Sequence, residues 1–312
     1  RYNACSLSNE TTIVALLIIT TILWAFSFSL IGEYLAGSVD SYFSVLMRVG
    51  LAALVFLPFL RTRGQSPRTI VLYMLVGAMQ LGIMYLLAFR AYLYLTVSEF
   101  LLFTVFTPLY ITLIYDLLSG RKLRWGYLLS AALAVLGAAI IRYDKVSDHF
   151  WTGLLLVQLS NLCFAIGMVG YKRLMEVRPM PQHNAFAWFY VGAFIVAVAA
   201  WFMLGNAQKL PTTTLQWSVL VWLGVVASGL GYFMWNYGAT QVDAGTLGIM
   251  NNVHVPAGLL VNLAIWQEQP HWPSFISGAL VILASLWVHR RWVAPHSGQT
   301  ADDRRRGSAQ SE

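Results

Sequence analysis

The chain alternates long apolar segments with short polar connections over most of its 312 residues. A membrane-spanning helix needs about 20 mainly apolar residues, and ten segments approach or exceed that length. They cover residues 11–35, 42–60, 69–92, 97–118, 124–142, 151–175, 184–204, 216–238, 244–266 and 273–289. Overall, 58% of the residues are hydrophobic and 11% are charged, against about 25% charged in an average soluble domain. The pattern predicts an all-α integral membrane protein with ten transmembrane helices in a lipid bilayer.

The second half of the chain repeats the first. Residues 89–141 align with residues 237–287 almost without gaps, and each copy contains three apolar segments with a proline in the middle one. Three matched pairs, Ala91 with Ala239, Pro108 with Pro256 and Trp125 with Trp272, are 148, 148 and 147 residues apart. Each half has an odd number of spans, so the second half enters the membrane from the opposite side. We therefore expect two inverted five-helix repeats, residues 1–142 and 151–293, with a site between them.

Lysines and arginines are distributed unevenly between the predicted connections. If both termini are cytoplasmic, 15 of the 20 basic residues lie on the cytoplasmic side, 3 lie outside, and Arg48 and Arg90 are embedded in spans. This asymmetry obeys the positive-inside rule, so the net charge of +7 is a signal of topology. The basic residues form no single face that would bind nucleic acid. The polar tail, residues 297–312, has the composition of a disordered cytoplasmic segment.

Charges embedded in a span are functional candidates, because each costs about 2.5–3.5 kcal/mol at the bilayer centre on insertion scales. Arg48 lies deepest; its guanidinium either holds the carboxylate of an anionic substrate or pairs with Glu33 or Glu99. Arg90 and Glu99 face each other across a short outer hairpin, as a structural ion pair or as a coupling site at which Glu99 takes up a proton. Each repeat also has a mid-span proline, which opens the helical hydrogen-bond ladder and is either a passive kink or part of the cavity. The predicted gating or coupling residues are Arg90, Glu99, Pro108 and Pro256.

Aromatic and polar side chains at matched depths indicate a central cavity. Phe103 and Phe106 share one face of the fourth span, and the same face of the ninth span carries Asn251 and His254. An unpaired polar group at that depth is expensive, so these positions are better explained by binding than by packing. The predicted substrate-binding residues are Trp24, Arg48, Tyr85, Phe103, Phe106, Trp235, Asn236, Asn251 and His254.

An enzyme is the competing class, and the sequence argues against it. None of the 6 histidines stands at metal-ligand spacing from another histidine, a cysteine or a carboxylate. The chain has no nucleophile elbow, phosphate-binding loop or dinucleotide fingerprint in the strand–turn–helix context that these motifs need. We therefore expect no cofactor and no metal, and the sequence indicates no obligate protein partner.

The repeated pattern resembles the EamA-type repeat of the drug/metabolite transporter superfamily over residues 14–293. The likeness rests on the hairpins at Ala91 and Ala239, on a proline one helix later, and on the small-residue last spans SALAVLGAAI and SGALVILAS. It implies ten helices in two inverted halves around a central cavity. The resemblance further implies that this cavity is lined mainly by the first, third, fourth, sixth, eighth and ninth spans.

Two stretches, MNNVHVPAGLLVNLAIW and MVGYKRLMEVRPMPQHNAFAWFY, are similar to biotin-transporting members of the carboxylate/amino acid/amine branch of that superfamily. This resemblance implies an importer of biotin in the bacterial inner membrane that works by alternating access without ATP of its own. The biotin carboxylate suits Arg48, and the ureido group suits Asn251, His254 or Asn236. An aromatic amino acid would satisfy many of the same groups. An amino-acid or metabolite exporter of the same fold is therefore the alternative, and a membrane-embedded enzyme is a remote one.

Overall fold

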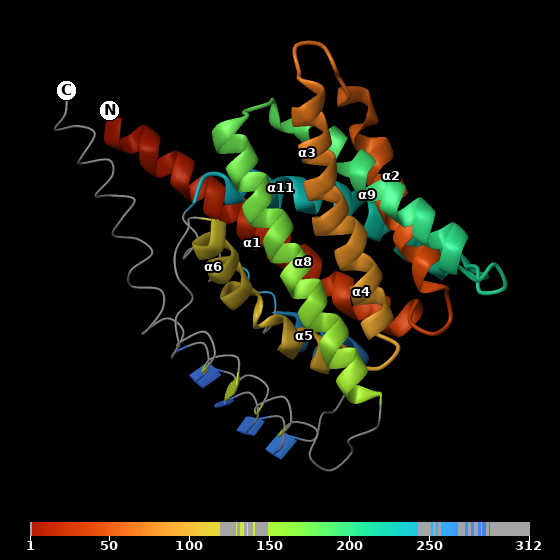
Figure 1. The fold of residues 1–312 in the computed structure, drawn as a ribbon. Helices are drawn as coiled ribbons and strands as arrows, with labels where there is room; N and C mark the ends of the chain where they lie inside the picture. Colours follow the sequence, from red (N-terminus) through yellow and green to blue (C-terminus); the bar gives the residue numbers. More distant parts are fainter. Residues whose placement is uncertain are drawn as a thin grey trace.

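The regular structure in the computed structural model is helical wherever residues are described (Figure 1). The described residues are 2–118, 149–242 and 257–267, with single or paired positions at 129, 132–133, 136, 140, 251 and 254 and between 272 and 287. In chain order the elements are α1 (Tyr2–Tyr34), α2 (Ser41–Phe56), η1 (Leu57–Phe59), α3 (Pro67–Gly77), η2 (Ala78–Ile83), α4 (Met84–Ala91), α5 (Val97–Thr104), α6 (Thr107–Leu118), α8 (Phe150–Val177), α9 (Gln182–Leu204), α10 (Thr214–Trp222), η3 (Leu223–Leu230), α11 (Gly231–Ala239) and η4 (Asn262–Trp266).

Seven stretches of the described residues are long and apolar enough to cross a membrane. They are Ala15–Tyr34, Ser41–Phe59, Pro67–Ala91, Val97–Leu118, Phe150–Val177, Gln182–Leu204 and Thr214–Ala239. Each corresponds to one of the predicted segments, so these spans are confirmed as membrane-length helices. A shorter apolar helix, Ala257–Trp266, lies in the predicted ninth segment. The predicted fifth and tenth segments, the start of the ninth and the tail fall largely or wholly outside the described residues.

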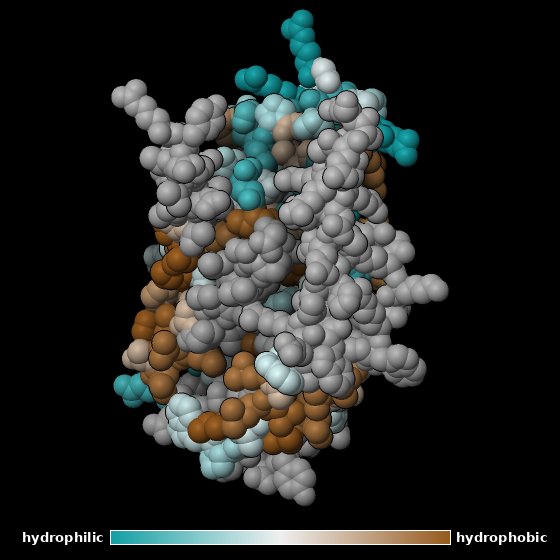
Figure 2. All heavy atoms as spheres, turned by 90° about the vertical axis from the view of Figure 1, so that its left-hand side faces the viewer, coloured by the Kyte–Doolittle hydropathy of each residue, from teal (hydrophilic) through white to brown (hydrophobic). Residues whose placement is uncertain are grey.

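The outside of the bundle is apolar, as a lipid-facing surface requires. Large aliphatic and aromatic side chains that are at least half exposed include Leu54, Leu75, Leu155, Ile195 and Phe202. Figure 2 shows hydrophobic side chains over the middle and lower parts of one face, and hydrophilic ones gathered at its upper end. That end carries the loop between α2 and α3 in Figure 1.

Two arginines of distant segments lie at the same end. Arg178, which follows α8, donates from Nη1 to Thr69 Oγ1 at 3.1 Å. The carbonyl of Arg61, in the loop after α2, accepts from Trp188 Nε1 at 3.2 Å. Lys209 lies at the opposite end, where its carbonyl accepts from the backbone nitrogen that precedes α2. Among these residues, the two arginines predicted to be on one side of the membrane lie at one end of the bundle, and the lysine predicted to be on the other side lies at the opposite end.

Close glycine contacts join α3 to α9. A Cβ atom on Gly77 would collide with the backbone of Phe189, and one on Gly192 would collide with the backbone of Met74. Small residues let helix backbones approach in this way, and such approach is a main source of helix association in lipid. The two helices thus pack backbone against backbone, next to the third-span element η2, which also packs on α9.

Helices α2 and α9, which correspond to the predicted second and seventh spans, cross in opposite directions. Near one end of the contact Phe43 packs on Trp201, and near the other Phe56 packs on Tyr190, with ring centroids 5.3 Å apart in both pairs. As the residue numbers rise along α2, their partners on α9 fall. The contact is therefore antiparallel.

The third and eighth spans make a second antiparallel contact. Gln80 and Asn236 exchange two amide hydrogen bonds of 3.0 and 3.2 Å, and the hydroxyl of Tyr85 lies 2.8 Å from Ser228 Oγ. Gln80 lies in the π-helical segment η2 of the third span, and Ser228 lies in the π-helical segment η3 of the eighth. The two segments overlap when the halves of the sequence are aligned at the 148-residue offset. Widened turns of this kind occur frequently at functional sites.

Candidate functional site

A cavity opens between the two halves, where these antiparallel contacts meet. Together with its mouth it encloses about 630 Å³. Its described lining comes from α1, α2, α4, α5, α6, α8, α11 and the hairpin after α4, with two positions from the predicted ninth span. The lining residues are Trp24, Ser27, Phe28, Ile31, Arg48, Met84, Tyr85, Ala88, Phe89, Tyr92, Phe100, Thr104, Thr107, Ser160, Asn161, Phe164, Tyr232, Asn251 and His254.

Arg48 is the charged residue of this lining. Its side chain is only 3% exposed, and the guanidinium carbon lies 4.1 Å from the ring centroid of Tyr85 and 5.9 Å from that of Phe89. Cation–π contacts of this kind stabilise a desolvated cation by about 2 kcal/mol. Its Nε donates to Ser228 Oγ at 2.5 Å. Within the described ranges no carboxylate lies at ion-pair distance from Arg48, so the predicted pairing with Glu33 or Glu99 is not formed.

Ser228 holds both Arg48 and Tyr85. Its hydroxyl contacts Arg48 Nε and the Tyr85 hydroxyl, and its carbonyl accepts from the hydroxyl of Tyr190 at 2.6 Å. The π-helical segment η3 brings Ser228 into reach, because Gly224 allows η3 to lie close to α2; a Cβ there would stand 2.7 Å from Leu51 Cβ. With Nε occupied, the two terminal nitrogens of Arg48 make no hydrogen bond to the other described residues.

An aromatic wall surrounds Trp24. Its ring centroid lies 4.6 Å from that of Tyr232 and 5.0 Å from that of Trp235, and its Nε1 donates to the carbonyl of Ala227 at 3.2 Å. Trp235 is completely buried behind this wall rather than on the cavity surface. Asn236 is also buried, in its paired hydrogen bonds with the third span. The structure therefore places Trp24 in the lining and the other two predicted residues one layer behind it.

Asn251 and His254 both reach the cavity and are only 2% and 4% exposed. Nε2 of His254 lies 3.0 Å from Thr104 Oγ1, and its ring centroid is 5.3 Å from that of Phe28. Nδ1 of His254 and Nδ2 of Asn251 are buried without a hydrogen-bond partner among the described residues. The polar wall predicted for the ninth span is thus present at these two positions.

The fourth span breaks into α5 and α6, as its proline predicts. Pro108 has no N–H to donate to the carbonyl of Thr104, which accepts from the hydroxyl of Thr107 at 2.6 Å instead. The prediction that Phe103 and Phe106 line the cavity is wrong: both are buried outside the lining, and Phe103 packs on α8 at Phe150. The cavity surface of this span is formed by Phe100, Thr104 and Thr107, a face rotated by about one residue from the predicted one. Pro256 lies outside the described residues.

The hairpin between α4 and α5 is stabilised by contacts at the start of α5. Glu99 accepts from the backbone N–H of Thr96 at 2.9 Å, and Thr96 Oγ1 accepts from the N–H of Glu99, which is a capping box at the start of α5. Arg90 instead lies over the ring of Tyr42, 5.8 Å from its centroid. The predicted partners Arg90 and Glu99 therefore make contacts with different residues.

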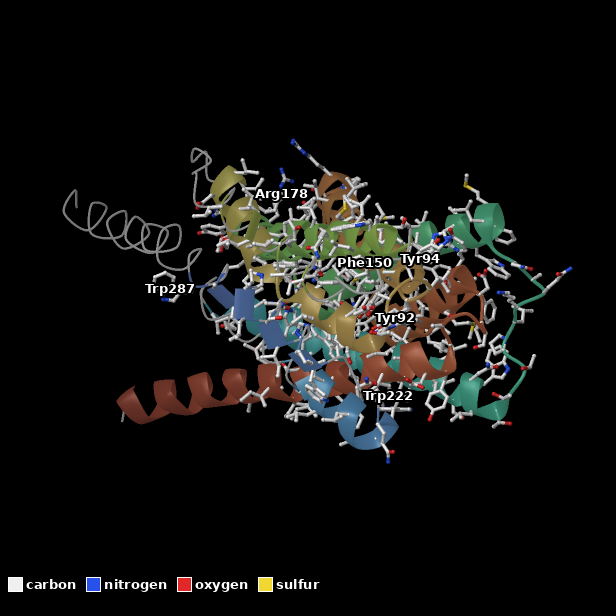
Figure 3. The ribbon with its side chains drawn as sticks, turned by 90° about the horizontal axis from the view of Figure 1, so that it is seen from below. Tyr92, Tyr94, Phe150, Arg178, Trp222 and Trp287 are labelled. Carbon is white, nitrogen blue, oxygen red and sulfur yellow. The ribbon has the colours of Figure 1, made fainter. Side chains whose placement is uncertain are left out.

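Tyr92, in the same hairpin, was not predicted and forms part of the lining. Its ring stacks on Phe100 with centroids 4.2 Å apart. Its neighbour Tyr94 contacts His149 at the start of α8, and Figure 3 labels Tyr92, Tyr94 and Phe150 near one another in the middle of the view. Only the position of Tyr92 next to a short predicted turn could have indicated its role.

Comparison with known proteins decides the family. The EamA-like transporter family matches residues 11–143 and 151–290, which is most of the chain and both repeats. The chain belongs to the EamA-like transporter family. The biotin transporter of Escherichia coli (strain K12) is 83% identical to this EamA-like chain over 299 residues, covering 96% of the chain and 100% of the relative.

One further relative and one solved structure extend the comparison. The probable biotin transporter of Pseudomonas aeruginosa is 55% identical over 276 residues, covering 88% of the EamA-like chain and 96% of its own. A solved crystal structure superposes with a TM-score of 0.62 over 90% of this chain and 96% of the other, at 17% identity. At that identity the superposition supports the fold alone.

Proposed function

We propose that this protein is a secondary transporter that imports biotin across the bacterial inner membrane by alternating access. The relatives named above supply the substrate class. The observation that carries the proposal is Arg48, a buried cation in the cavity wall with no carboxylate partner among the described residues. An uncompensated charge at membrane depth is a substrate site by default, and a guanidinium binds a carboxylate with two parallel hydrogen bonds.

The rest of the lining favours biotin over an amino acid. Biotin is an anion without an ammonium group, whereas an amino acid carries both charges. None of the described lining residues is acidic, so an ammonium group in the cavity has no carboxylate to pair with. The apolar chain and thioether ring of biotin match the aromatic surface formed by Trp24, Phe164 and Tyr232.

The repeat supports alternating access. Ten helices in two inverted halves, residues 1–142 and 151–293, require that corresponding spans run in opposite directions. The antiparallel contacts of α2 with α9 and of the third with the eighth span support this arrangement. So does the packing pattern, in which α9 contacts η2 as α2 contacts η3, and α8 contacts α4 as α1 contacts α11.

The orientation follows from charge. The location of Arg61 and Arg178 at one end of the bundle, with Lys209 at the other, supports a cytoplasmic location for the arginine-bearing end. Both termini, including residues 297–312, are then cytoplasmic, and the hairpin with Tyr92 faces outward.

We assign substrate contact to the five predicted residues that line the cavity, and a supporting role to the four behind it. The contact residues are Trp24, Arg48, Tyr85, Asn251 and His254. The supporting residues are Phe103, Phe106, Trp235 and Asn236. Gating or coupling is assigned to Arg90, Glu99, Pro108 and Pro256.

The deciding experiment is uptake of labelled biotin into proteoliposomes of the purified protein, with excess unlabelled biotin or tryptophan as competitor. We expect saturable uptake that biotin blocks and tryptophan does not. Exchange of tryptophan or another amino acid without biotin uptake would overturn the proposal and identify an exporter of the same fold.

A further inference from the structure

Two buried nitrogen atoms in the cavity wall have no hydrogen-bond partner among the described residues: Nδ2 of Asn251 and Nδ1 of His254. A buried polar atom left unpaired costs about 1–3 kcal/mol, and nearly all such atoms in folded proteins are paired. Both side chains are more than nine-tenths buried, and both line the cavity. They are therefore groups that a ligand would satisfy.

Thr104 determines what His254 can offer to that ligand. The Thr104 hydroxyl has one hydrogen, and it donates this hydrogen to the carbonyl of Leu101 at 2.6 Å. Toward Nε2 of His254, 3.0 Å away, Thr104 Oγ1 can then only accept. With the Thr104 hydrogen directed at Leu101, the ring proton of neutral His254 is assigned to Nε2, and Nδ1 then presents a lone pair as an acceptor.

Asn251 lies three positions before His254, so their side chains project from the same side of a helix. The Nδ2 group of Asn251 is a donor. The wall thus presents one acceptor and one donor side by side. A cyclic ureide has the complementary edge, an N–H next to a carbonyl oxygen.

We propose that Thr104, by holding His254 in the Nε2-protonated tautomer, makes the Asn251–His254 pair a recognition subsite for the cyclic ureide of the substrate. The N–H of the ureide donates to His254 Nδ1, and its carbonyl accepts from Asn251 Nδ2. This inference rests on the proposed function and deepens it, because it assigns to Thr104 the selection of one end of biotin.

The surroundings strengthen both hydrogen bonds. The ring of Phe28 covers the imidazole of His254 at 5.3 Å and lies 5.7 Å from the ring of Phe100. Apolar walls lower the local dielectric, which strengthens a satisfied hydrogen bond and penalises an unsatisfied one. A substrate that lacks the N–H therefore leaves Nδ1 of His254 unpaired and is discriminated against.

The test compares wild-type protein with Thr104→Val, which keeps the shape and removes the hydroxyl, and with Thr104→Ser, which keeps the hydroxyl. Each is assayed in proteoliposomes with labelled biotin against two competitors: desthiobiotin, which retains the ureide, and biotin methylated on the ureido nitrogens. In the wild type and Thr104→Ser we expect the methylated compound to compete at least about tenfold more weakly than desthiobiotin, the loss typical of one buried hydrogen bond. In Thr104→Val we expect the KM for biotin to rise about tenfold and the two competitors to converge.

The outcomes separate the two proposals. Absence of saturable biotin uptake by the wild type removes the proposed function, and the ureide subsite with it. Biotin uptake with equal competition by both analogues in the wild type overturns the subsite alone, and this measurement needs no variant to fold. Retention of the wild-type competitor ratio in a folded Thr104→Val protein overturns the role of Thr104. A purely structural role would lower uptake of all compounds without changing their ratio.

Discussion

Replacement of Arg48 by methionine, which has a similar length and no charge, tests the proposed carboxylate anchor. Nε is occupied by Ser228, so two terminal nitrogens remain for a carboxylate. Each charge-assisted hydrogen bond contributes about 1.5–3 kcal/mol. Two of them give at least about 3 kcal/mol, which corresponds to a rise of about 100-fold in the KM for biotin. Because Arg48 is already desolvated in the empty cavity, its own desolvation does not reduce this figure further.

The assay compares biotin with biotin methyl ester, which lacks the negative charge. Wild-type proteoliposomes should prefer the acid strongly, and Arg48→Met should lose most of that preference. The same substitution removes a buried unpaired charge that costs about 2.5–3.5 kcal/mol on insertion scales, so its thermal midpoint should stay level or rise. Arg173→Met, which removes an arginine from an exposed ion pair with Glu176, is the matched control. An unchanged acid-to-ester ratio in Arg48→Met would refute the reasoning.

Three further substitutions test the surroundings of the cavity. Ser228→Ala should raise the KM for biotin about fivefold, because about 1 kcal/mol of hydrogen bonding to Arg48 is lost; an unchanged KM in uptake assays would exclude this positioning role. Gly77→Ala should lower stability by about 1–3 kcal/mol through backbone overlap, whereas Gly170→Ala, whose Cβ would meet a single side-chain atom at 3.3 Å, should change the thermal midpoint little. Lys172→Met removes an ammonium group that caps the carbonyls at the end of α11; amide exchange in that loop should then rise about tenfold, and unchanged exchange would contradict the capping role.

Much of the architecture was readable from hydrophobic length and charge. Seven predicted spans coincide with membrane-length helices, and the break at Pro108 follows from its missing N–H. The positions of Trp24 and Arg48 in the cavity also followed from depth, since a polar or charged group within a span needs a protein or ligand partner. These features depend on local chemistry, which a sequence displays directly.

The cavity surface of the fourth span could not be predicted, because an apolar span buried on every side does not show how the helix is rotated about its axis. Phe100, Phe103 and Thr104 all lie in α5, whose residues are buried on every side, and the structure turns Phe100 and Thr104 rather than Phe103 to the cavity. The hydrogen bond between Arg48 and Ser228 could not be predicted either, because Ser228 comes within reach of Arg48 through a π-helical segment. The pattern of hydrophobic positions does not indicate where such a segment occurs.

The glycine contacts between α3 and α9 have a mechanical consequence. The backbones of α3 and α9 touch at Gly77 and Gly192, so neither helix can slide or rotate against the other without a collision. The two helices should therefore move as one rigid body. The fourth span, in contrast, is broken between α5 and α6. Next to this break, the carbonyl of Phe103 accepts hydrogen bonds from the side-chain amides of Gln158 and Asn161 of α8, at 3.3 and 3.0 Å. Such bonds can be exchanged one at a time. We therefore expect the motion that admits a substrate to be concentrated at the break between α5 and α6, while α3 and α9 keep their positions relative to each other.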